Sequence, residues 1–492
     1  METALAELKE RLGGLTDLRR TEGLLLWDMQ VFMPPGGAPT RAAQLATLEE
    51  IVHARVVDER FGELFEALEP LAAGLPEDSD DACLIRVARR DWERARRVPT
   101  ELAVEFAKVS AESYDAWVKA RAESDFAAFA PWLERIVDLR RRYIECYAPY
   151  DDAYDVLLED YEPGMKTSEI REIFSVLRPE LRALVAERAT DEEDAFMKGP
   201  FPIAAQDALS RELCEAFGAT WDQFRLDTTV HPFEITLGLG DIRLTSRYAE
   251  DDLLSLFTAM HECGHGLYEW GVSRTLERTP LAAGVSATLH ESQSRLWENV
   301  VGRSLPFWRW FYPRVQAAFP GPLGDVPVED FHRVINRVRR SFIRVDADET
   351  SYGLHVILRF ELEQELLTGR LAVKDLPDAW NARFEELMGI TVPNDAVGVL
   401  QDAHWSGGGF GYFPTYLLGT VLSVQVWERV REAIPSLDEQ IERGDFAELH
   451  GWLGETIYSL GRKLTPAETV RRAVGGPLSP EPYLEYLRAK AG

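Results

Sequence analysis

The residues best suited to chemistry are two histidines one helical turn apart. His261 and His265 stand at positions i and i+4, with Glu262 between them, in the sequence HECGH. Two imidazoles at this spacing can hold one divalent metal ion, and a glutamate beside them can take a proton from water. A helix can also carry two histidines by chance, but an accidental HExxH is expected in roughly one or two of a hundred such chains. The motif therefore favours a metal site.

A catalytic metal site of this kind needs a third protein ligand and one open position. No HxxGxxH extension follows His265, which excludes the class with three histidines. Glu291, in the polar stretch TLHESQSRLWE, lies 26 residues beyond His265, enough for one helix, a loop and a return. Alone, this stretch would be interpreted as a solvated helix face, but beside an HExxH motif without a third ligand it favours metal binding. Cys263 points away from the histidine face and is predicted to be a packing residue.

The elements that must position these residues are mainly helices. Apolar residues before and within the HECGH motif recur at i, i+3, i+4 and i+7, which predicts a helix with one buried face. The segment directly before it, residues 224–248, is β-branched and alternating, and it predicts a small antiparallel hairpin or meander with its turn at Gly238-Leu239-Gly240. Five further segments show helical periodicity: Thr40–Val57, Ala82–Arg97, Thr100–Ala122, Phe126–Ala148 and Ser168–Thr190. The predicted fold class is mainly α, with a small antiparallel β element beside the metal helix.

The composition argues against two classes of partner. The chain has 492 residues, with 54 Lys and Arg against 83 Asp and Glu, and a net charge of −29. Because a phosphate-binding surface must be basic, we expect no nucleic acid and no anionic membrane as partner.

Four scattered cysteines form neither a disulfide framework nor a CxxC metal spacing, which favours a reducing, cytoplasmic location. The charged, amphipathic first segment predicts a helix rather than a targeting segment, and the glycines within residues 403–427 predict a loop and a buried helix rather than a membrane span.

The domain organisation is predicted to be simple. We find no internal repeat, low-complexity tract or long linker, and the 46% hydrophobic content supports a large core. We expect a single helical domain over residues 1–492 in two lobes, with the short sheet between them. Its N-terminal helical part would cover about residues 1–220, and the catalytic motifs cover residues 231–416.

Six motifs together resemble a known family. HExxH and HESQ occur with HPF at residues 231–233, DxRxT at 241–245, IRxxAD at 343–348 and GxxQDxHW at 398–405. In this combination they resemble the carboxypeptidase Taq family of zinc-type metallocarboxypeptidases. No motif position departs from the family pattern. The resemblance implies a mainly helical, two-lobed shell around a long central groove, and it suggests a homodimer.

The resemblance also implies the roles of the metal-site residues. It makes His261, His265 and Glu291 the ligands of one divalent ion, and Glu262 the general base and acid. The chemistry asks for the same roles, because a metal polarises the scissile carbonyl and acidifies its water while a carboxylate moves the proton. Zinc (Zn2+) is the expected ion, although Co2+ or Mn2+ would also suit two imidazoles and a carboxylate.

Three of the remaining motifs are predicted to include substrate-binding residues. Asp241, Arg243 and Thr245 lie in the predicted β element, where an edge strand could hold a peptide backbone; the alternative is a structural hairpin. Gln401, in GxxQDxHW, is a further candidate for substrate contact. Arg344 is predicted to grip the terminal carboxylate of a peptide as a bidentate fork, or else to be a salt-bridged core arginine.

Two supporting roles stay open at this stage. A metal-ligating histidine usually donates its second ring N–H to a carboxylate or carbonyl, and Asp348 or Glu349 is a candidate acceptor. If Arg344 does not bind the terminal carboxylate, Arg243 and Arg295 are the next candidates because they also lie near catalytic motifs.

His404 begins a glycine-rich stretch, HWSGGGFGYFPTY, that ends at Tyr416. Neither a GKS or GKT signature nor GxGxxG is present, so nucleotide binding is not predicted. The arrangement resembles the histidine, glycine loop and tyrosine that helical zinc peptidases place opposite the metal. By this resemblance His404 and Tyr416 would donate hydrogen bonds to the tetrahedral intermediate, with Tyr412 as an alternative, and His231 would contact the substrate backbone. Tyr416 could equally be a packing residue.

We therefore predict a cytoplasmic metallocarboxypeptidase that releases C-terminal amino acids through attack by a metal-bound water. Its expected partners are peptide substrates with a free C-terminus. Two alternatives stay open: an oligoendopeptidase or dipeptidyl carboxypeptidase of the same helical type, and a noncatalytic, metal-stabilised binding protein. The presence of Glu262 argues against the binding protein, because metal binding alone needs only the ligands.

Overall fold

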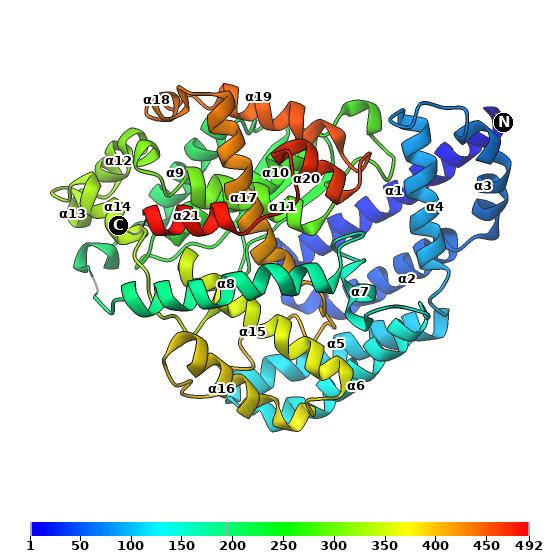
Figure 1. Ribbon diagram of the computed structural model, residues 1–492, viewed down its shortest axis with the longest axis horizontal. Helices are drawn as coiled ribbons and strands as arrows, with labels where there is room; N and C mark the ends of the chain where they lie inside the picture. Colours follow the sequence, from blue (N-terminus) through cyan, green and yellow to red (C-terminus); the bar gives the residue numbers. More distant parts are fainter. Residues whose placement is uncertain (1, 193, 491–492) are drawn as a thin grey trace.

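The helical pattern of the sequence is confirmed in a computed structural model, which describes residues 2–192 and 194–490 (Figure 1). The five predicted segments correspond to helices α2, α4, α5, α6 and α8, with ends that differ by at most three residues. The helices before the sheet are α1 (Glu2–Val31), α2 (Ala38–Val56), α3 (Glu59–Ala72), α4 (Asp80–Ala95), α5 (Thr100–Glu123), α6 (Phe126–Glu145), α7 (Ala153–Leu158), α8 (Thr167–Arg188) and α9 (Ile203–Phe217).

The helices after the sheet include α10 and α11, which carry the predicted metal ligands. They are α10 (Leu254–Trp270), α11 (Ala287–Arg295), α12 (Leu305–Ala318), α13 (Pro320–Leu323), α14 (Val328–Ile335), α15 (Glu349–Thr368), α16 (Leu376–Met388), α17 (Phe413–Ala433), α18 (Leu437–Ile441), α19 (Ala447–Thr456), α20 (Pro466–Val474) and α21 (Glu481–Lys490). A π-helical turn, η4 (Leu296–Val301), continues α11, and a 3-10 turn, η5 (Arg344–Asp346), precedes α15. Within the described residues, no helix is long and apolar enough to cross a membrane.

The predicted β element is a sheet of three strands, β1 (Phe224–Thr228), β2 (Glu234–Gly238) and β3 (Asp241–Ser246), in the order β1-β3-β2. The hairpin turn between β2 and β3 is where the glycines predicted it. An entirely antiparallel arrangement is wrong, however, because β1 pairs with the other edge of β3 and runs parallel to it. The connection between β1 and β2 crosses over, so β3 is the central strand and both of its edges are paired.

Two apolar clusters support this arrangement. The larger one includes side chains from α5 through α21 and from β1 and β3. The smaller one joins α1, α3 and α4 to the turn after β2 and to residues 272–282. Figure 1 shows α1–α4, in blue, at the end of the molecule away from α12–α14. The first helices therefore pack in a second, smaller core that they share with the turn after β2 and with residues 272–282.

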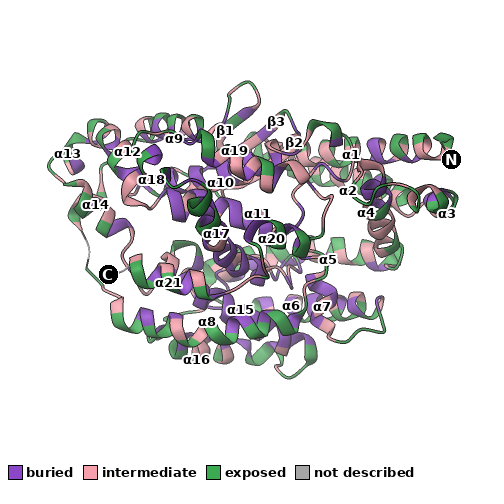
Figure 2. Cartoon of the chain, turned by 45° about the horizontal axis from the view of Figure 1, so that its top comes forward, coloured by how far each residue is buried: buried purple, intermediate pink, exposed green. Residues whose placement is uncertain are grey.

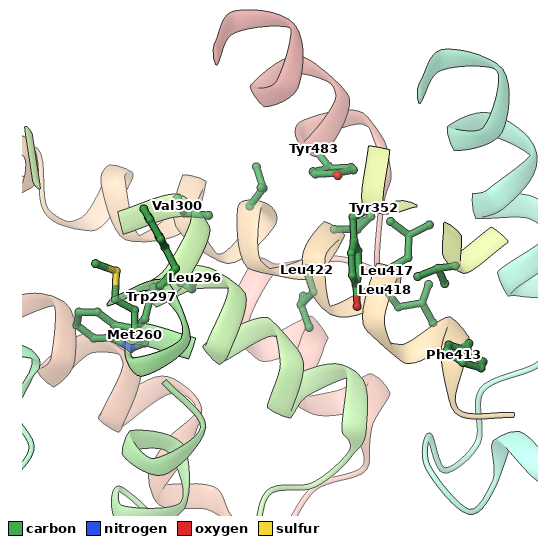
Figure 3. Close-up of a cluster of buried hydrophobic side chains, with 14 of the residues drawn as sticks. Met260, Leu296, Trp297, Val300, Tyr352, Phe413, Leu417, Leu418, Leu422 and Tyr483 are labelled. Carbon is green, nitrogen blue, oxygen red and sulfur yellow. The ribbon is translucent and has the colours of Figure 1, made fainter. Parts of the chain in front are cut away.

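Helix α10, which carries His261 and His265, packs within the larger cluster. α10, α11 and α17 are buried along much of their length (Figure 2). Figure 3 shows the packing around them, from Met260 and Trp297 at one end of the view to Phe413 at the other. Two glycines allow the helices to approach closely: a Cβ on Gly264 would lie 2.8 Å from the Gln293 carbonyl oxygen, and one on Gly419 would lie 2.6 Å from the Glu291 Cβ.

Candidate metal centre

The predicted ligands come together where α10 crosses α11. Nε2 of His261 lies 3.7 Å from Oε2 of Glu291, and Nε2 of His265 lies 3.5 Å from the same oxygen. Ligand atoms bound at about 2.0–2.1 Å around a tetrahedral ion lie about 3.4 Å apart. These two distances fit a single divalent ion, and all three ligand atoms lie within 4.8 Å of one another.

The first histidine is oriented by a glutamate on η4. Nδ1 of His261 lies 2.8 Å from Oε2 of Glu298, which also accepts from Arg295 at 3.2 Å. Burial alone would raise the pKa of Glu298, but Arg295 and His261 lower it to about 2, so the group is a carboxylate. A carboxylate can only accept, so Nδ1 carries the proton and the lone pair of Nε2 faces the ligand site.

The second histidine is held by a different chain of hydrogen bonds. Nδ1 of His265 lies 2.6 Å from Nδ1 of His290, and Nε2 of His290 lies 2.9 Å from Oε1 of Glu269. Glu269 Oε1 also accepts from the backbone N–H of Gly284 at 2.7 Å. In its neutral form His290 donates from Nε2 to Glu269, so that its Nδ1 accepts from the Nδ1–H of His265. The relay thus leaves Nε2 of His265 free to bind metal.

These contacts correct one sequence-based prediction. Asp348 does not support a ligand histidine; its side chain caps α15 by accepting from the backbone N–H of Thr350 and Ser351. Glu349 instead binds the Lys490 ammonium at 2.7 Å. Both carboxylates are used to fix the ends of α15 and α21, so neither reaches the metal ligands.

The third ligand and the predicted base differ in charge. Glu291 is buried, which by itself would raise its pKa, but Arg295, His261 and His265 hold that pKa well below its usual range. Its Oε1 accepts from Arg295 at 2.6 Å, so Oε2 faces the histidines. Burial, with repulsion from Glu291, raises the pKa of Glu262 to about 7, despite the nearby His261. Glu291 is therefore suited to hold a cation and Glu262 to exchange a proton.

The centre opens into a cavity of about 1050 Å³. His261, Glu262, His265 and Glu291 form part of its wall together with Tyr412 and Tyr416. The cavity continues past β2 to α4, where Arg90 and Arg94 line it. The metal centre is thus accessible from a long cavity, as a peptide substrate requires.

The predicted histidine and tyrosine pair is also assembled. Nε2 of His404 and the hydroxyl of Tyr416 lie 3.2 Å apart, and the ring of Tyr412 lies 5.0 Å from that of Tyr416. Burial, together with Arg344 and Arg359, lowers the pKa of His404 to about 4, so its imidazole is neutral at neutral pH. Burial raises the pKa of the Tyr416 phenol well above its usual value. Tyr416 therefore stays protonated and can donate a hydrogen bond.

The glycine-rich segment between these residues is pinned by a buried acid on α15. Glu363 accepts from the Trp405 indole N–H at 2.8 Å, the Gly411 backbone N–H at 3.0 Å and the Tyr154 hydroxyl at 2.5 Å. Burial raises the pKa of Glu363 to about 7. This single carboxyl group fixes both ends of the segment that follows His404.

Arg344 and Gln401 occupy the wall behind the cavity rather than its surface. The Arg344 guanidinium donates to Asp402 at 2.9 Å and to the Tyr352 hydroxyl at 2.9 Å, and it lies 4.9 Å from the centre of the Tyr416 ring. Gln401 accepts from the Arg344 backbone N–H at 2.8 Å and donates to two backbone carbonyls. In this arrangement the fork of Arg344 is already occupied.

The DxRxT residues have structural surroundings. Asp241 and Arg243 form a bidentate ion pair at 2.9 Å, and Thr245 is fully buried. The Thr245 hydroxyl accepts from the backbone N–H of Phe233 and donates to its carbonyl, which ties the HPF segment to β3. The expectation of an edge strand is wrong, since β3 is central, so this geometry gives no support to substrate binding by these residues. His231 is exposed, before the part of HPF that lines the cavity.

Some supporting residues were missed in the sequence although a signal was present. Glu269 follows His265 by four residues, and Glu298 follows Glu291 by seven, so each lies on the ligand-bearing face of its own helix. Glu363 had no such signal, because its partners belong to segments far away in the chain.

Comparisons with known proteins agree with this geometry. A family model described as carboxypeptidase Taq (M32) metallopeptidase matches residues 7–491. Thermostable carboxypeptidase 1 of Thermus thermophilus is 39% identical over 482 residues, which cover 95% of this chain and 94% of that protein. Carboxypeptidase 1 of Bacillus subtilis is 35% identical over 471 residues, with the same coverage. The crystal structure of an M32 carboxypeptidase from Deinococcus radiodurans superposes with a TM-score of 0.96 at 40% identity, covering 100% of this chain and 99% of the other.

Proposed function

The chain belongs to the carboxypeptidase Taq (M32) metallopeptidase family, as its motifs predicted, and we propose that it releases C-terminal amino acids from peptides. Family membership makes it a hydrolase that acts on peptides and implies a divalent metal ion. The observation that carries the finer proposal is the meeting of three ligand atoms beside Glu262 in the wall of a long cavity.

In this proposal, His261, His265 and Glu291 hold the ion. When bound, the ion would polarise the scissile carbonyl and lower the pKa of water. Glu262 takes the proton of the attacking water and passes it to the leaving amine. A carboxyl group whose pKa is raised to about 7 is matched to both steps near neutral pH.

Hydrogen bonds to the developing oxyanion are proposed to come from Tyr416 and His404, with Tyr412 as the alternative donor. The protonated phenol of Tyr416 and the neutral imidazole of His404 are both suited to donate. Arg344 and Asp402 would act behind them: their ion pair packs against the Tyr416 ring and fixes the segment that begins at His404.

Three finer properties are also proposals. Zinc is the ion we propose, because two imidazoles and one carboxylate form a donor set typical of catalytic zinc sites. A cytoplasmic location is supported by the four free cysteines. A homodimer is proposed from the family resemblance alone.

Blocked peptides test the proposed activity. A carboxypeptidase should shorten a peptide with a free C-terminus one residue at a time and leave its amidated twin nearly intact; mass spectrometry of the digest distinguishes them. Glu262→Gln, loaded with metal, should lose about 100- to 10,000-fold in kcat/KM while retaining its ion. Equal cleavage of both peptides would show an endopeptidase, and cleavage of neither by the metal-loaded wild type would show a binding protein.

A further inference from the structure

The acids that line the cavity are not equivalent. Among the described residues, six line it: Asp91, Glu159, Asp160, Glu234, Glu262 and Glu291. Four of them are paired with an arginine: Asp91 with Arg462 at 2.9 Å, Glu159 with Arg90 at 2.7 Å, Asp160 with Arg94 at 2.6 Å and Glu291 with Arg295 at 2.6 Å. Glu262 is the proposed base. Among the described residues, Glu234 is therefore the one acid of the cavity wall that has neither an arginine partner nor a role in the proposed reaction.

Glu234 is placed to meet whatever enters the cavity. It begins β2 directly after Pro232 and Phe233, which line the same wall. Its Oε1 accepts from the Thr236 hydroxyl at 2.6 Å, and Oε2 has no hydrogen-bond partner among the described residues. The Thr236 contact fixes the carboxyl group and leaves one oxygen for a ligand.

The neighbouring charges do not neutralise this carboxyl group. Glu269 and Glu262 repel it, and the nearby His290 is already bound to Glu269 at 2.9 Å. Burial, followed by repulsion from Glu269, raises the pKa of Glu234 to about 8. Because an unpaired carboxylate is costly in this position, an arriving cation would both ionise the group and be held by it.

We propose that Glu234 is a specificity-determining residue that binds a positively charged group of the peptide, an ammonium or guanidinium, near the scissile bond. The inference rests on the proposed peptidase function and adds a substrate class to it: peptides with a basic residue, or a free α-amine, at the part of the cavity that Glu234 lines. A charge-assisted hydrogen bond supplies both the attraction and the direction.

Matched peptides test this proposal. N-acetylated tetrapeptides with a free C-terminus carry Lys or norleucine, which have similar length, at the last, second-last or third-last position. The wild type should prefer Lys at one of these positions by roughly 10- to 100-fold in kcat/KM, and Glu234→Gln should bring that ratio close to 1. The norleucine peptides are also prepared with a free α-amine. If these are cleaved faster than their acetylated twins, and Glu234→Gln removes that difference, the α-amine is the cation.

Two further variants sharpen the result. Glu212→Gln removes a carboxylate from an exposed ion pair with Arg314, outside the cavity, and should leave the Lys to norleucine ratio unchanged. Glu234→Lys should reverse the preference, so that a peptide with Glu is cleaved faster than one with Gln. Metal content and circular dichroism establish that each variant is folded.

The proposal is overturned if the wild type prefers neither Lys nor a free amine at any position, or if Glu234→Gln keeps the preference. Its failure can be told apart from failure of the proposed activity. Binding of the same peptides to metal-loaded Glu262→Gln, measured by calorimetry, reports the Lys preference without any cleavage.

Discussion

The close approach of α17 to the back of Glu291 can be tested with one methyl group. In Gly419→Ala, the new Cβ would lie 2.6 Å from the Glu291 Cβ, 2.7 Å from its Cγ and 3.0 Å from the Thr288 carbonyl oxygen. Carbon atoms that are not bonded rest about 3.5–4.0 Å apart, so the two groups must separate by about 1 Å. Both helices are buried, so Glu291 itself is expected to move.

The expected effect on metal binding is larger than the effect on stability. Overpacking of a core costs about 1–3 kcal/mol of unfolding free energy. A ligand oxygen that should bind at about 2.0–2.1 Å is no longer bonded after a shift of about 1 Å. Metal affinity should therefore fall at least as far as when a supporting group is lost, about 10- to 100-fold.

Metal titration in a buffered series of free zinc concentrations measures the affinity, and thermal unfolding of the metal-free protein measures the stability. Gly451→Ala, in α19, is the matched control, because nothing lies within 4 Å of its added Cβ and Ala favours a helix. It should retain wild-type metal affinity. Wild-type metal affinity in Gly419→Ala would refute the reasoning that this contact positions Glu291. If the stability fell while the metal affinity stayed unchanged, Gly419 would serve helix packing only.

The remaining predictions concern the ligands, the cavity wall and the glycine-rich segment. Glu291→Ala should lose most of its metal on dialysis because only two ligands remain, whereas His290→Ala should weaken metal binding about 10- to 100-fold. Metal analysis of the two dialysed variants compares them, and a greater loss in His290→Ala would contradict the ligand assignment. Arg344→Ala should lower kcat/KM by the same factor for free and amidated peptides, because Asp402 occupies its guanidinium; a loss confined to free C-termini would show that Arg344 grips the carboxylate. Burial raises the pKa of Glu363 from 4.5 to about 7. Between these pH values the folded state keeps a proton that the unfolded chain releases. The contribution of this group to the unfolding free energy should therefore fall by about 3 kcal/mol as the pH rises from 4.5 through 7. Denaturant unfolding at pH 5 and pH 8 should show a loss in the wild type that is larger by about this amount than the loss in Glu363→Gln, in which the other acids with raised pKa values still titrate; equal losses in the two proteins would contradict the prediction.

What could be predicted from the sequence is what depends on local spacing. Periodicity predicted the helices, and the distance of four residues between His261 and His265 placed two candidate ligands on one face because a helix has 3.6 residues per turn. The sheet was predicted as a segment but not in its topology. The alternation of residues in β1 predicts a strand but does not indicate whether it pairs with β2 or with β3, and the structure shows that it pairs with β3.

Charge is where sequence reasoning about this site reaches its limit, because the chemistry of a charged side chain depends on what is paired with it. For Arg344 the sequence left open a fork for the substrate carboxylate or a salt-bridged core arginine, and only the structure shows that Asp402, 58 residues further along the chain, pairs with it. Glu234 directly follows the HPF motif and has no sequence pattern that predicts a function, yet among the described residues it is the cavity acid left without a cation. Neither the ion pair of Arg344 nor the lack of a cation beside Glu234 has a periodic signature in the sequence, since each arises only when distant segments pack together. The unpaired charges of a cavity, on which a proposal about substrate preference depends, are therefore seen only in the folded structure, while candidate metal ligands can be predicted from the spacing of the sequence.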